Sequence, residues 1–409
     1  MKLGSIAFRN IFRNIRRSLL SASAIGVAAL SIVLLYSLLE GMKEDMQYNL
    51  QTYITGAVRI RNAEFSKNER LNPLHLTVED PESLMKMLQE EEGVTGISPR
   101  ISFPARIYKD EENFNALGMG VNFDTEIFYQ DLGPEVIKEG RLPETGKNEA
   151  LIGYKLAQKV GVGVGDKMTI LSITAARGTN AITFVLTGLA AFPLGSLNET
   201  VFYAPLDRVQ YFLRMPGQVQ EILVKTDNNT DPVLVAASMK EKSGVSPDLE
   251  IMDWTAISTT YSMIEMASTM YDIFALFFFV LGCSVILNTT IMVIFERMKE
   301  IGTLAAMGMS GRNLVRLFFL ESLFISMIGS FIGVSLGIII TQILHTTGIN
   351  LGAAMEGVDF DISTVIYPKL SLKSTVFVFI YSVAVASFTS IFPSRKASRI
   401  EPVEALRAV

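Results

Sequence analysis

The sequence predicts a polytopic α-helical membrane protein with a large α/β domain outside the membrane. Its 409 residues are 49% hydrophobic and only 19% charged, below the roughly 25% charged residues of soluble domains. The net charge of −5 conceals a division: residues 40–270 hold 21 basic and 32 acidic side chains, and the remainder holds 15 and 9. This division indicates two electrical environments and excludes a plain cytosolic enzyme, a disordered chain and a cationic nucleic-acid binder.

Four long segments without charged interruptions are expected to cross the membrane, except that the third contains Glu321 near its start. About 20 apolar residues are enough to cross the ~30 Å hydrocarbon layer as a helix. A cleaved signal peptide is the alternative for the first segment, but its 22 uncharged residues exceed the usual 7–15 of such peptides. We therefore expect a retained anchor. The expected transmembrane helices are residues 18–39, 273–295, 317–344 and 375–392.

Basic residues beside these segments predict the orientation, because Lys and Arg accumulate on the cytoplasmic side. They are concentrated in residues 1–17, 296–316 and 393–409, whereas residues 345–374 carry two lysines and three acidic residues. We expect cytoplasmic termini, a cytoplasmic loop at 296–316, an extracytoplasmic loop at 345–374 and a cytoplasmic tail at 393–409. Residues 1–17 read as an amphipathic helix along the inner headgroups or simply as a basic flank that sets topology.

Residues 40–272 are then extracytoplasmic. Their two ends keep a helical apolar spacing, which predicts that the first and second spans continue outward as stalks. Between the stalks the chain alternates strand and helix patterns, which predicts one sizeable α/β core, in one or two lobes. Asp80 and Pro81 are typical of a helix start, and we expect this helix to reach about residue 91. The strands are expected at residues 57–61, 101–108, 168–174 and 182–189.

The sequence predicts no catalytic, cofactor or metal site. His75 and His345 have no Cys or His partner at ligand spacing, and Cys283 is the single cysteine. Gly161, Gly163 and Gly165 lack the spacing of a phosphate-binding loop, and a tight turn between a helix and a strand explains them better. We expect no nucleotide hydrolysis by this chain alone.

Two features of the third span predict helix packing. Gly329, Gly333 and Gly337 form a ladder on one face, which allows close approach of a second helix, either within the chain or across a dimer. Glu321 lies about one turn inside the span, where a carboxylate is costly unless it is paired or near the interface. An anchoring contact with Arg312 or Arg316 is expected rather than proton coupling.

The loop after the second span is short, helical in pattern and rich in small side chains, which suits insertion into the groove of a partner. Together with Glu321 and the glycine ladder, it closely resembles the permease module shared by the FtsX, MacB and lipoprotein-releasing permeases. The tail from Pro393 to Arg407 is similar to the C-terminal signature of that family. The motif that starts at Gly140-Arg141-Leu142-Pro143 and ends at Gly165-Asp166 looks like the MacB-type periplasmic core domain.

The nearest resemblance is to the LolC/LolE lipoprotein-releasing permeases. It rests on Glu40-Gly41-Met42, on Leu213-Arg214-Met215-Pro216-Gly217 and on Asp253-Trp254. One departure is the stretch 172–183, which is short and lacks the proline of the carrier-binding hook of LolC. This stretch is more similar to LolE or to a relative without a carrier.

The resemblance implies a type VII ABC transporter in the bacterial inner membrane, with the large domain in the periplasm. Its partners would be a cytoplasmic ABC ATPase dimer, a second identical or different permease, a lipoprotein substrate, membrane lipids and a periplasmic carrier if one docks. ATP and Mg would be used by the ATPase, with no cofactor on this chain. By resemblance, the residues that couple to the ATPase are Glu296, Arg297, Glu300, Ile301, Gly302, Leu304 and Gly308.

Extraction of lipoproteins by mechanotransmission is the leading functional hypothesis. Apolar residues at the stalk bases are the expected substrate cavity, because flexible methionines adapt to varied acyl chains, although packing of the two stalks explains them equally well. The alternatives are a MacB-like exporter of an antibiotic, peptide or toxin, and an FtsX-like regulator of a cell-wall hydrolase, whose domain is generally smaller. The candidate cavity residues are Leu35, Leu38, Met42, Met266, Met270 and Phe274.

Overall fold

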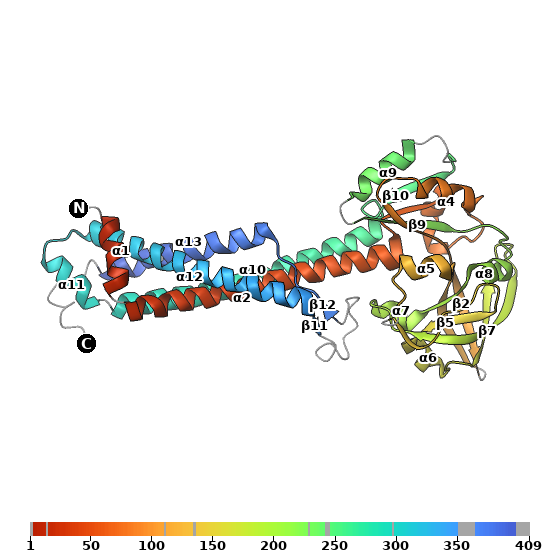
Figure 1. Cartoon of the computed structure of the whole chain (residues 1–409), viewed down its shortest axis with the longest axis horizontal. Helices are drawn as coiled ribbons and strands as arrows, with labels where there is room; N and C mark the ends of the chain where they lie inside the picture. The colour runs from red at the N-terminus through yellow and green to blue at the C-terminus, as the bar shows by residue number, and fades with distance from the viewer. Residues whose placement is uncertain are drawn as a thin grey trace. The chain divides into compact units, whose positions relative to one another are not determined.

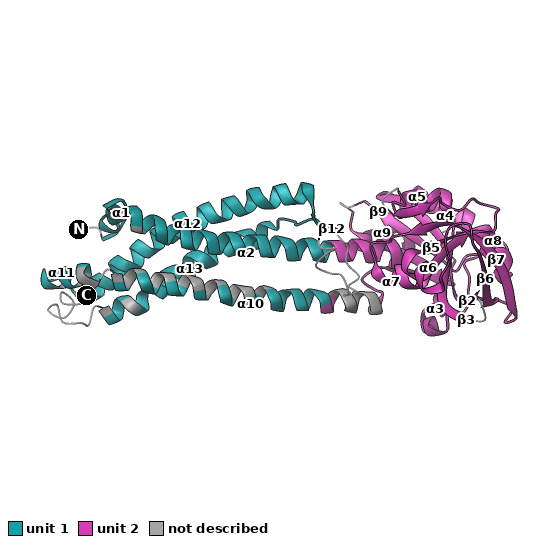
Figure 2. Ribbon diagram, turned by 90° about the horizontal axis from the view of Figure 1, so that it is seen from below, with its two compact units in different colours: residues 1–44, 267–351, 365–409 teal, residues 45–266, 352–364 magenta. Residues whose placement is uncertain are grey.

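The computed structural model describes residues 3–13, 15–109, 112–133, 136–227, 230–241, 246–296, 298–350 and 365–397. Arg297, residues 351–364 of the expected loop at 345–374 and most of the expected tail lie outside these residues. The chain divides into two compact units (Figure 2), which we call the helical unit, residues 1–44, 267–351 and 365–409, and the sheet unit, residues 45–266 and 352–364. Each unit has its own buried apolar clusters.

Long helices make up the helical unit. They are α1 (Leu3–Arg13), most of α2 (Ile15–Leu50), most of α10 (Ser258–Glu296), α11 (Met298–Ala306), α12 (Gly311–Thr347) and α13 (Leu372–Ala397) (Figure 1). Two short strands, β11 (Ile349–Asn350) and β12 (Val365–Ile366), pair in antiparallel fashion. In the part of the chain that the structure describes, three helices are long and apolar enough to span a membrane: Ser18–Thr55, Gly311–Thr347 and Leu372–Lys396. They contain the expected first, third and fourth spans.

Helices α2 and α10 continue well past the expected membrane segments. Helix α2 has 36 residues, about 54 Å at the usual rise, and is followed directly by a π-helical turn, η1 (Gln51–Thr55). Helix α10 has 39 residues and contains the whole expected second span. Both lengths exceed the ~30 Å hydrocarbon layer, in agreement with the predicted helical stalks.

Helix α1 is amphipathic, as its sequence predicts. Ala7 and Ile11 are buried, whereas Arg9 and Arg13 are exposed. The Phe8 ring meets the ring of Phe324 on α12 edge to face, with 5.7 Å between centroids. The apolar side of α1 therefore packs on the bundle rather than only lying along lipid.

A ten-stranded mixed sheet forms the centre of the sheet unit. Its path is β10-β1-β9-β2-β3-β8-β5-β7-β4, and β6 pairs with both β2 and β7. Strands β3 and β8, and strands β5 and β7, run parallel, and the other pairs are antiparallel. The strands are β1 (Val58–Asn62), β2 (Val94–Lys109), β3 (Glu112–Val121), β4 (Ile137–Gly140), β5 (Glu149–Gly153), β6 (Lys167–Ile173), β7 (Thr179–Ala190), β8 (Val201–Pro205), β9 (Glu221–Thr226) and β10 (Leu249–Asp253).

All four expected strands are present, and β2 is much longer than expected. Its first part contains Gly96 and Pro99, which strands disfavour. Pairing with β9 nevertheless holds it in place, with Pro99 opposite Ile222. Tertiary pairing here overrides local preference.

Short helices flank the sheet. They are α3 (Ala63–Lys67), the 3-10 turn η2 (Glu69–Leu71), α4 (Pro81–Gln89), α5 (Phe123–Tyr129), α6 (Tyr154–Val160), α7 (Gly195–Thr200), α8 (Leu206–Leu213) and α9 (Pro232–Glu241). The Asp80 carboxylate accepts from the Ser83 amide at 3.4 Å, which confirms it as the N-cap of α4. Gly161, with φ of +73°, ends α6 in the turn before β6, as the glycine spacing predicts.

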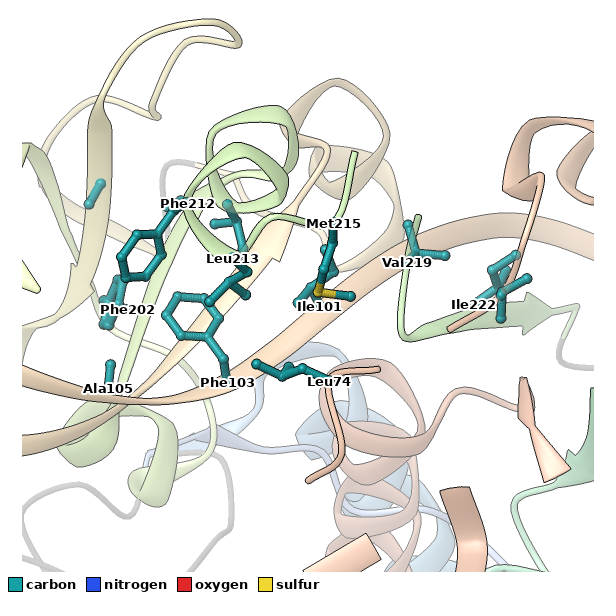
Figure 3. Packing of buried hydrophobic residues seen from close by; sticks show 14 of the residues in the cluster. Leu74, Ile101, Phe103, Ala105, Phe202, Phe212, Leu213, Met215, Val219 and Ile222 are labelled. Carbon is teal, nitrogen blue, oxygen red and sulfur yellow. The ribbon is translucent and has the colours of Figure 1, made fainter. Parts of the chain in front are cut away.

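The main core of the sheet unit lies between the sheet and its helices (Figure 3). The Phe103 ring on β2 contacts Phe202 and Phe212 edge to face, with centroids 5.9 and 5.8 Å apart. A side chain on Gly118, in the neighbouring strand, would overlap the Phe103 ring. Burial of such rings stabilises the unit by about 1.5–3 kcal/mol per side chain, so the sheet unit has a substantial core of its own.

Candidate functional site

The predicted coupling segment forms a separate helix, α11, between α10 and α12. Glu296 is the last residue of α10, and Glu300, Ile301, Gly302 and Leu304 all lie on α11. Gly302 is buried, Glu300 and Leu304 are half-buried, and the side chains of Glu296 and Ile301 are not described. A short helix joins the cytoplasmic ends expected for the second and third spans.

Gly308 ends this segment in a conformation that favours glycine. Its φ is +89°, a region in which a side chain is strained. The preceding turn is closed by bonds from the Met307 amide to the Thr303 carbonyl and from the Met309 amide to the Leu304 carbonyl, both 3.1 Å. The glycine therefore fixes the reversal between α11 and α12, and Met307 beside it is 71% exposed.

The glycine ladder of α12 faces α2 of the same chain. A Cβ atom on Gly329 would overlap the Ala22 carbonyl, and one on Gly333 would overlap the Gly26 carbonyl. The approach is mutual, because a Cβ on Gly26 would lie 2.9 Å from the Gly329 oxygen. Gly337 faces Val33 farther along. These contacts between backbones require glycine, and they lie within one chain.

Glu321 lies on α12 and is only 2% exposed. Near it, α12 packs with α1, α2 and α13 through Ile11, Ile25, Ile325 and Ala386. The carboxylate thus sits in the helix bundle rather than on its surface, which fits an anchoring residue.

Small hydroxyl side chains form a polar seam that sequence reasoning missed. Ser37 on α2 and Thr341 on α12 are 3.1 Å apart, and Ser326 on α12 lies 3.5 Å from Ser387 on α13. All four are buried. Such residues hydrogen-bond across helices in membranes. Their only signal in the sequence is the frequency of serine in apolar segments.

The six candidate cavity residues divide between two environments. Leu35, Leu38 and Met42 are half-buried on α2. Met266, Met270 and Phe274 on α10 are 64%, 46% and 49% exposed. They belong to a longer row of exposed apolar side chains on α10 that also includes Ile273, Leu276, Phe277, Val280 and Leu281. This row needs lipid, cargo or another polypeptide to cover it.

A different apolar groove, of about 320 Å³, lies between α1, α2 and α12 in the helical unit. Its lining includes Phe12, Leu19, Val27 and Ile328, and none of the six cavity residues.

In the sheet unit, a buried arginine fastens the end of the first stalk. Arg100 on β2 donates from Nη1 to the Tyr53 carbonyl at 2.8 Å and from Nη2 to the Thr52 carbonyl at 3.3 Å. Nη2 also bonds Glu126 Oε1 on α5 at 2.6 Å, and Nε bonds Ser98 Oγ at 3.0 Å. Arg100 and Glu126 are 1% and 0% exposed. We call this set of residues the stalk anchor.

Charge and burial act on this anchor together. Burial by itself would lower the pKa of Arg100, but the Glu126 carboxylate holds it above its usual value. Burial raises the pKa of the neighbouring Tyr203 to about 12. The guanidinium therefore stays charged throughout the physiological pH range.

The Gly140-Arg141 motif, which is part of the family resemblance, has a structural role in the sheet unit. Arg141 donates to both carboxylate oxygens of Glu149, at 2.9 and 2.7 Å, and this bond holds the pKa of Glu149 below its usual value. Gly140 before it has φ of +82°, and a Cβ atom at this position would overlap the Thr187 carbonyl. The Gly140-Arg141 motif is thus a clamp between the ends of β4 and β5.

The stretch 172–183 forms the tight hairpin between β6 and β7. Arg177 takes a left-handed conformation at its tip, and the Thr174 amide bonds the Gly178 carbonyl at 2.8 Å. Beside it lies a groove of about 710 Å³ that β2, β3 and the loop at residues 71–75 complete. Among the described residues, no group of three or more His, Cys, Asp or Glu side chains is arranged to hold a metal ion.

Comparison with known proteins matches both parts of the chain. Residues 18–242 match the MacB-like periplasmic core domain, and residues 273–402 match the FtsX-like permease C-terminal family. The lipoprotein-releasing system transmembrane protein LolC of Xylella fastidiosa is 23% identical over 86% of this chain and 86% of its own length. LolE of Haemophilus influenzae is 23% identical over 94% of this chain and 93% of its own length. The macrolide export ATP-binding/permease protein MacB of Chlorobium phaeobacteroides is 25% identical over 98% of this chain and 60% of its own length.

Proposed function

The chain belongs to the family of ABC transporter permeases with a MacB-like periplasmic core domain and an FtsX-like C-terminal region, and we propose that its cargo is a lipoprotein. In this proposal a separate ATPase supplies the work, and the chain extracts lipoproteins from the outer leaflet of the inner membrane by mechanotransmission. The relatives named LolC and LolE support the choice of cargo. The chain is a transmembrane subunit that does not catalyse ATP hydrolysis itself.

The observation that carries the proposal is the exposed apolar row on α10, whose members are 46–64% exposed between Met266 and Leu281. An acyl chain gains about 0.8 kcal/mol for each CH₂ that it buries. A lipid-anchored cargo leaving the bilayer therefore needs an apolar surface on which to wait. Leu35, Leu38 and Met42 of α2 together with Met266, Met270 and Phe274 of α10 are proposed to supply it.

The proposed topology has four spans, with α10 as the second, in addition to the three helices that qualify by length and composition. Both termini are cytoplasmic in this arrangement, and the domain between the first and second spans is periplasmic. The positive residues near the spans support it. A second permease, identical or different, completes the transmembrane part.

Helix α11 is proposed to seat on the ATPase, which binds ATP and Mg. Its shortness, the glycine-dependent reversal at Gly308 and the exposed Met307 support this role. The contact residues are proposed to be Glu296, Arg297, Glu300, Ile301, Gly302, Leu304 and Gly308. A rigid short helix can transmit movement of the ATPase to α10 and α12, because α10 ends just before it and α12 begins a few residues after it.

The cargo is tested by reconstitution of the chain with its ATPase and partner permease in proteoliposomes that contain a labelled triacylated lipoprotein. ATP-dependent release into solution is expected, with or without an added carrier protein. Phe274→Ala should lower release, whereas Phe388→Ala, which changes an equally large exposed ring on α13, should not. Absence of release from the wild-type assembly would contradict the cargo.

The ATPase contact is tested by Gly302→Trp. We expect normal membrane insertion but loss of ATPase assembly or of coupling, measured by co-purification and by cargo-stimulated ATP hydrolysis. Glu300→Ala, a smaller change on the same helix, should weaken coupling with the fold intact. Normal transport by Gly302→Trp would refute the assignment of α11.

A MacB-like exporter is the second candidate, because the MacB relative matches 98% of this chain. In that case the reconstituted assembly would move a periplasmic peptide or antibiotic and leave lipoprotein in the bilayer. An FtsX-like regulator would move neither, and a cell-wall hydrolase would stimulate its ATP turnover. The same proteoliposomes distinguish these outcomes. A periplasmic carrier, if one docks, is best sought at the hairpin of β6 and β7.

A further inference from the structure

The carbonyls at the end of the first stalk have an unusual partner. The last carbonyls of a helix normally bond to a capping turn or to water. Here the Thr52 and Tyr53 carbonyls, in the π-helical turn η1 that follows α2, accept from the buried Arg100 guanidinium. A cation at a helix C-terminus is favourable, and π-helical turns are frequent at functional positions.

Arg100 connects three elements through one side chain. It lies on β2 in the interior of the sheet, where it is paired with Glu221 of β9 and Val121 of β3. Its guanidinium reaches η1 through the two carbonyls and α5 through Glu126. The Ser98 hydroxyl also donates to the Glu126 carboxylate, so both charges have hydrogen-bond partners.

A second set of contacts holds the same stalk through the side chains of Tyr48 and Tyr53. The Tyr48 hydroxyl donates to Asp131 Oδ2 at 2.8 Å, and Lys225 Nζ lies 3.3 Å from the same oxygen. The Tyr53 hydroxyl donates to the Gln130 carbonyl at 3.2 Å. Asp131 and Gln130 directly follow α5, the helix that carries Glu126. The stalk end is thus bound to β2, to Glu126 in the middle of α5 and to the two residues that follow α5.

A buried ion pair is a poor explanation of stability alone. Replacement of such a pair by apolar groups of similar volume is often neutral or stabilising. Apolar contacts, however, are non-directional and permit sliding, whereas hydrogen bonds to charged groups fix both distance and angle. The charged hydrogen bonds of Arg100 therefore suit a rigid connection between the stalk end and the sheet.

We propose that Arg100 and Glu126 are positioning residues that form the joint through which movement of α2 is delivered to the sheet unit. This proposal rests on the proposed function, in which ATP hydrolysis moves the stalks. When α2 shifts, the carbonyls of Thr52 and Tyr53 move β2 and α5 with them through the guanidinium. Without the joint, the stalk moves and the sheet unit does not follow.

The test uses the double variant Arg100→Met/Glu126→Leu in the full chain, assembled with its ATPase and partner permease in proteoliposomes. It replaces both charges by apolar side chains of similar length, so the fold is retained. We expect unchanged ATP hydrolysis and lipoprotein release lowered about tenfold, a usual size for coupling between sites. Arg100→Lys, which keeps the charge but loses the planar fork, should also lower release relative to ATP hydrolysis.

The matched control is Gln220→Met. Gln220 is a buried polar residue of the same unit whose side chain bonds Ser102 and Asn72, neither of which belongs to the stalk. The Gln220→Met variant should keep the wild-type ratio of lipoprotein release to ATP hydrolysis. Release by the double variant at the wild-type rate, or an equal loss in Gln220→Met, would overturn the joint.

A measurement without cargo separates this proposal from the function on which it rests. Spin labels on cysteines at the exposed positions Ile54 and Tyr211, with Cys283 replaced by alanine, report the distance between the stalk end and the rest of the sheet unit. We expect one narrow distribution that ATP leaves unchanged in the otherwise wild-type chain, and a broad, ATP-dependent distribution in the double variant. Identical distributions in both would overturn the joint, even if no lipoprotein is released by any form.

Discussion

The sheet unit and the helical unit bury polar groups of different kinds. The sheet unit encloses whole charges, with Arg100 and Glu126 at 1% and 0% exposure. Among its described residues, the helical unit buries mainly hydroxyl groups, such as Ser326 and Thr341, with Glu321 as the buried carboxylate. The sheet unit folds from water, where a charge pair is satisfied by dense hydrogen bonding. The helical unit has lipid as its alternative solvent, so small hydroxyls and backbone contacts suffice.

The largest expected change in stability comes from removing only one member of the buried ion pair. Glu126→Ala leaves Arg100 charged and buried without its counter-ion, which should destabilise the sheet unit by about 3–5 kcal/mol. Urea unfolding followed by the fluorescence of Trp254, the single tryptophan and a residue of this unit, measures the change. Arg100→Met/Glu126→Leu should recover most of the loss. A single variant as stable as the wild type would contradict the importance of the pair.

The second largest effect is expected from disrupting the close contact between α12 and α2 in the helical unit. Gly333→Leu places a side chain against the Gly26 carbonyl, and overpacking of this kind costs about 1–3 kcal/mol. Loss of helical circular dichroism during titration with a denaturing detergent should begin earlier, while the Trp254 signal stays unchanged. Ile332→Leu, at an exposed position of the same helix, is the control. A shift in the Trp254 transition instead would show that the two units do not unfold separately.

A third, smaller effect concerns the bidentate pair of the exposed Arg141 and Glu149, because solvent screens exposed ion pairs. The pKa of Glu149 is lowered in the folded protein by Arg141. The stabilisation is therefore present above the usual value of 4.5 and is lost as the pH falls through the lower folded-state pKa. The urea midpoint of the wild type should be higher than that of Glu149→Gln at neutral pH, and the difference between the two midpoints should shrink as the pH falls below 4.5. An advantage that grows in acid would contradict the assignment.

The smallest effect concerns the hydroxyl seam. Ser326→Ala removes a contact with Ser387 at 3.5 Å, and single interhelical hydrogen bonds in membranes contribute about 0.6 kcal/mol on average. The detergent titration used for Gly333→Leu should move only slightly. A loss as large as that of Gly333→Leu would mean that the seam, rather than the glycine contact, holds α12 in place.

Much of the fold follows from contiguous stretches of sequence. The helices that contain all four expected spans, the four expected strands, the Asp80 cap and the turn at Gly161 are all present. Each depends on residues within about one or two turns of one another, so periodicity and capping preferences are enough. The start of β2 was missed because Gly96 and Pro99 are held by pairing with β9, which no local pattern encodes.

The candidate sites were predicted less evenly. The glycine ladder was visible as a repeat, but its partner on α2, about 300 residues away in sequence, was not. Gly41 appeared only as part of a family motif. In the structure a Cβ at that position would overlap the Tyr367 carbonyl, so glycine is needed there for close packing. The stalk anchor could not be predicted from the sequence. Arg100, Glu126 and Tyr53 belong to no motif, and only the fold brings them together.

By itself, the sequence determined which segments have the length and apolarity to span a membrane, where the acidic α/β domain lies between them and which family motifs the chain carries. These properties reside in neighbouring residues and in net charge. Only the tertiary structure decided which groups meet: Ser37 with Thr341, 304 positions apart, and Arg100 with the Tyr53 carbonyl, 47 positions apart. The reason is physical, because a hydrogen bond depends on distance in space, and only folding brings such distant groups within hydrogen-bond distance.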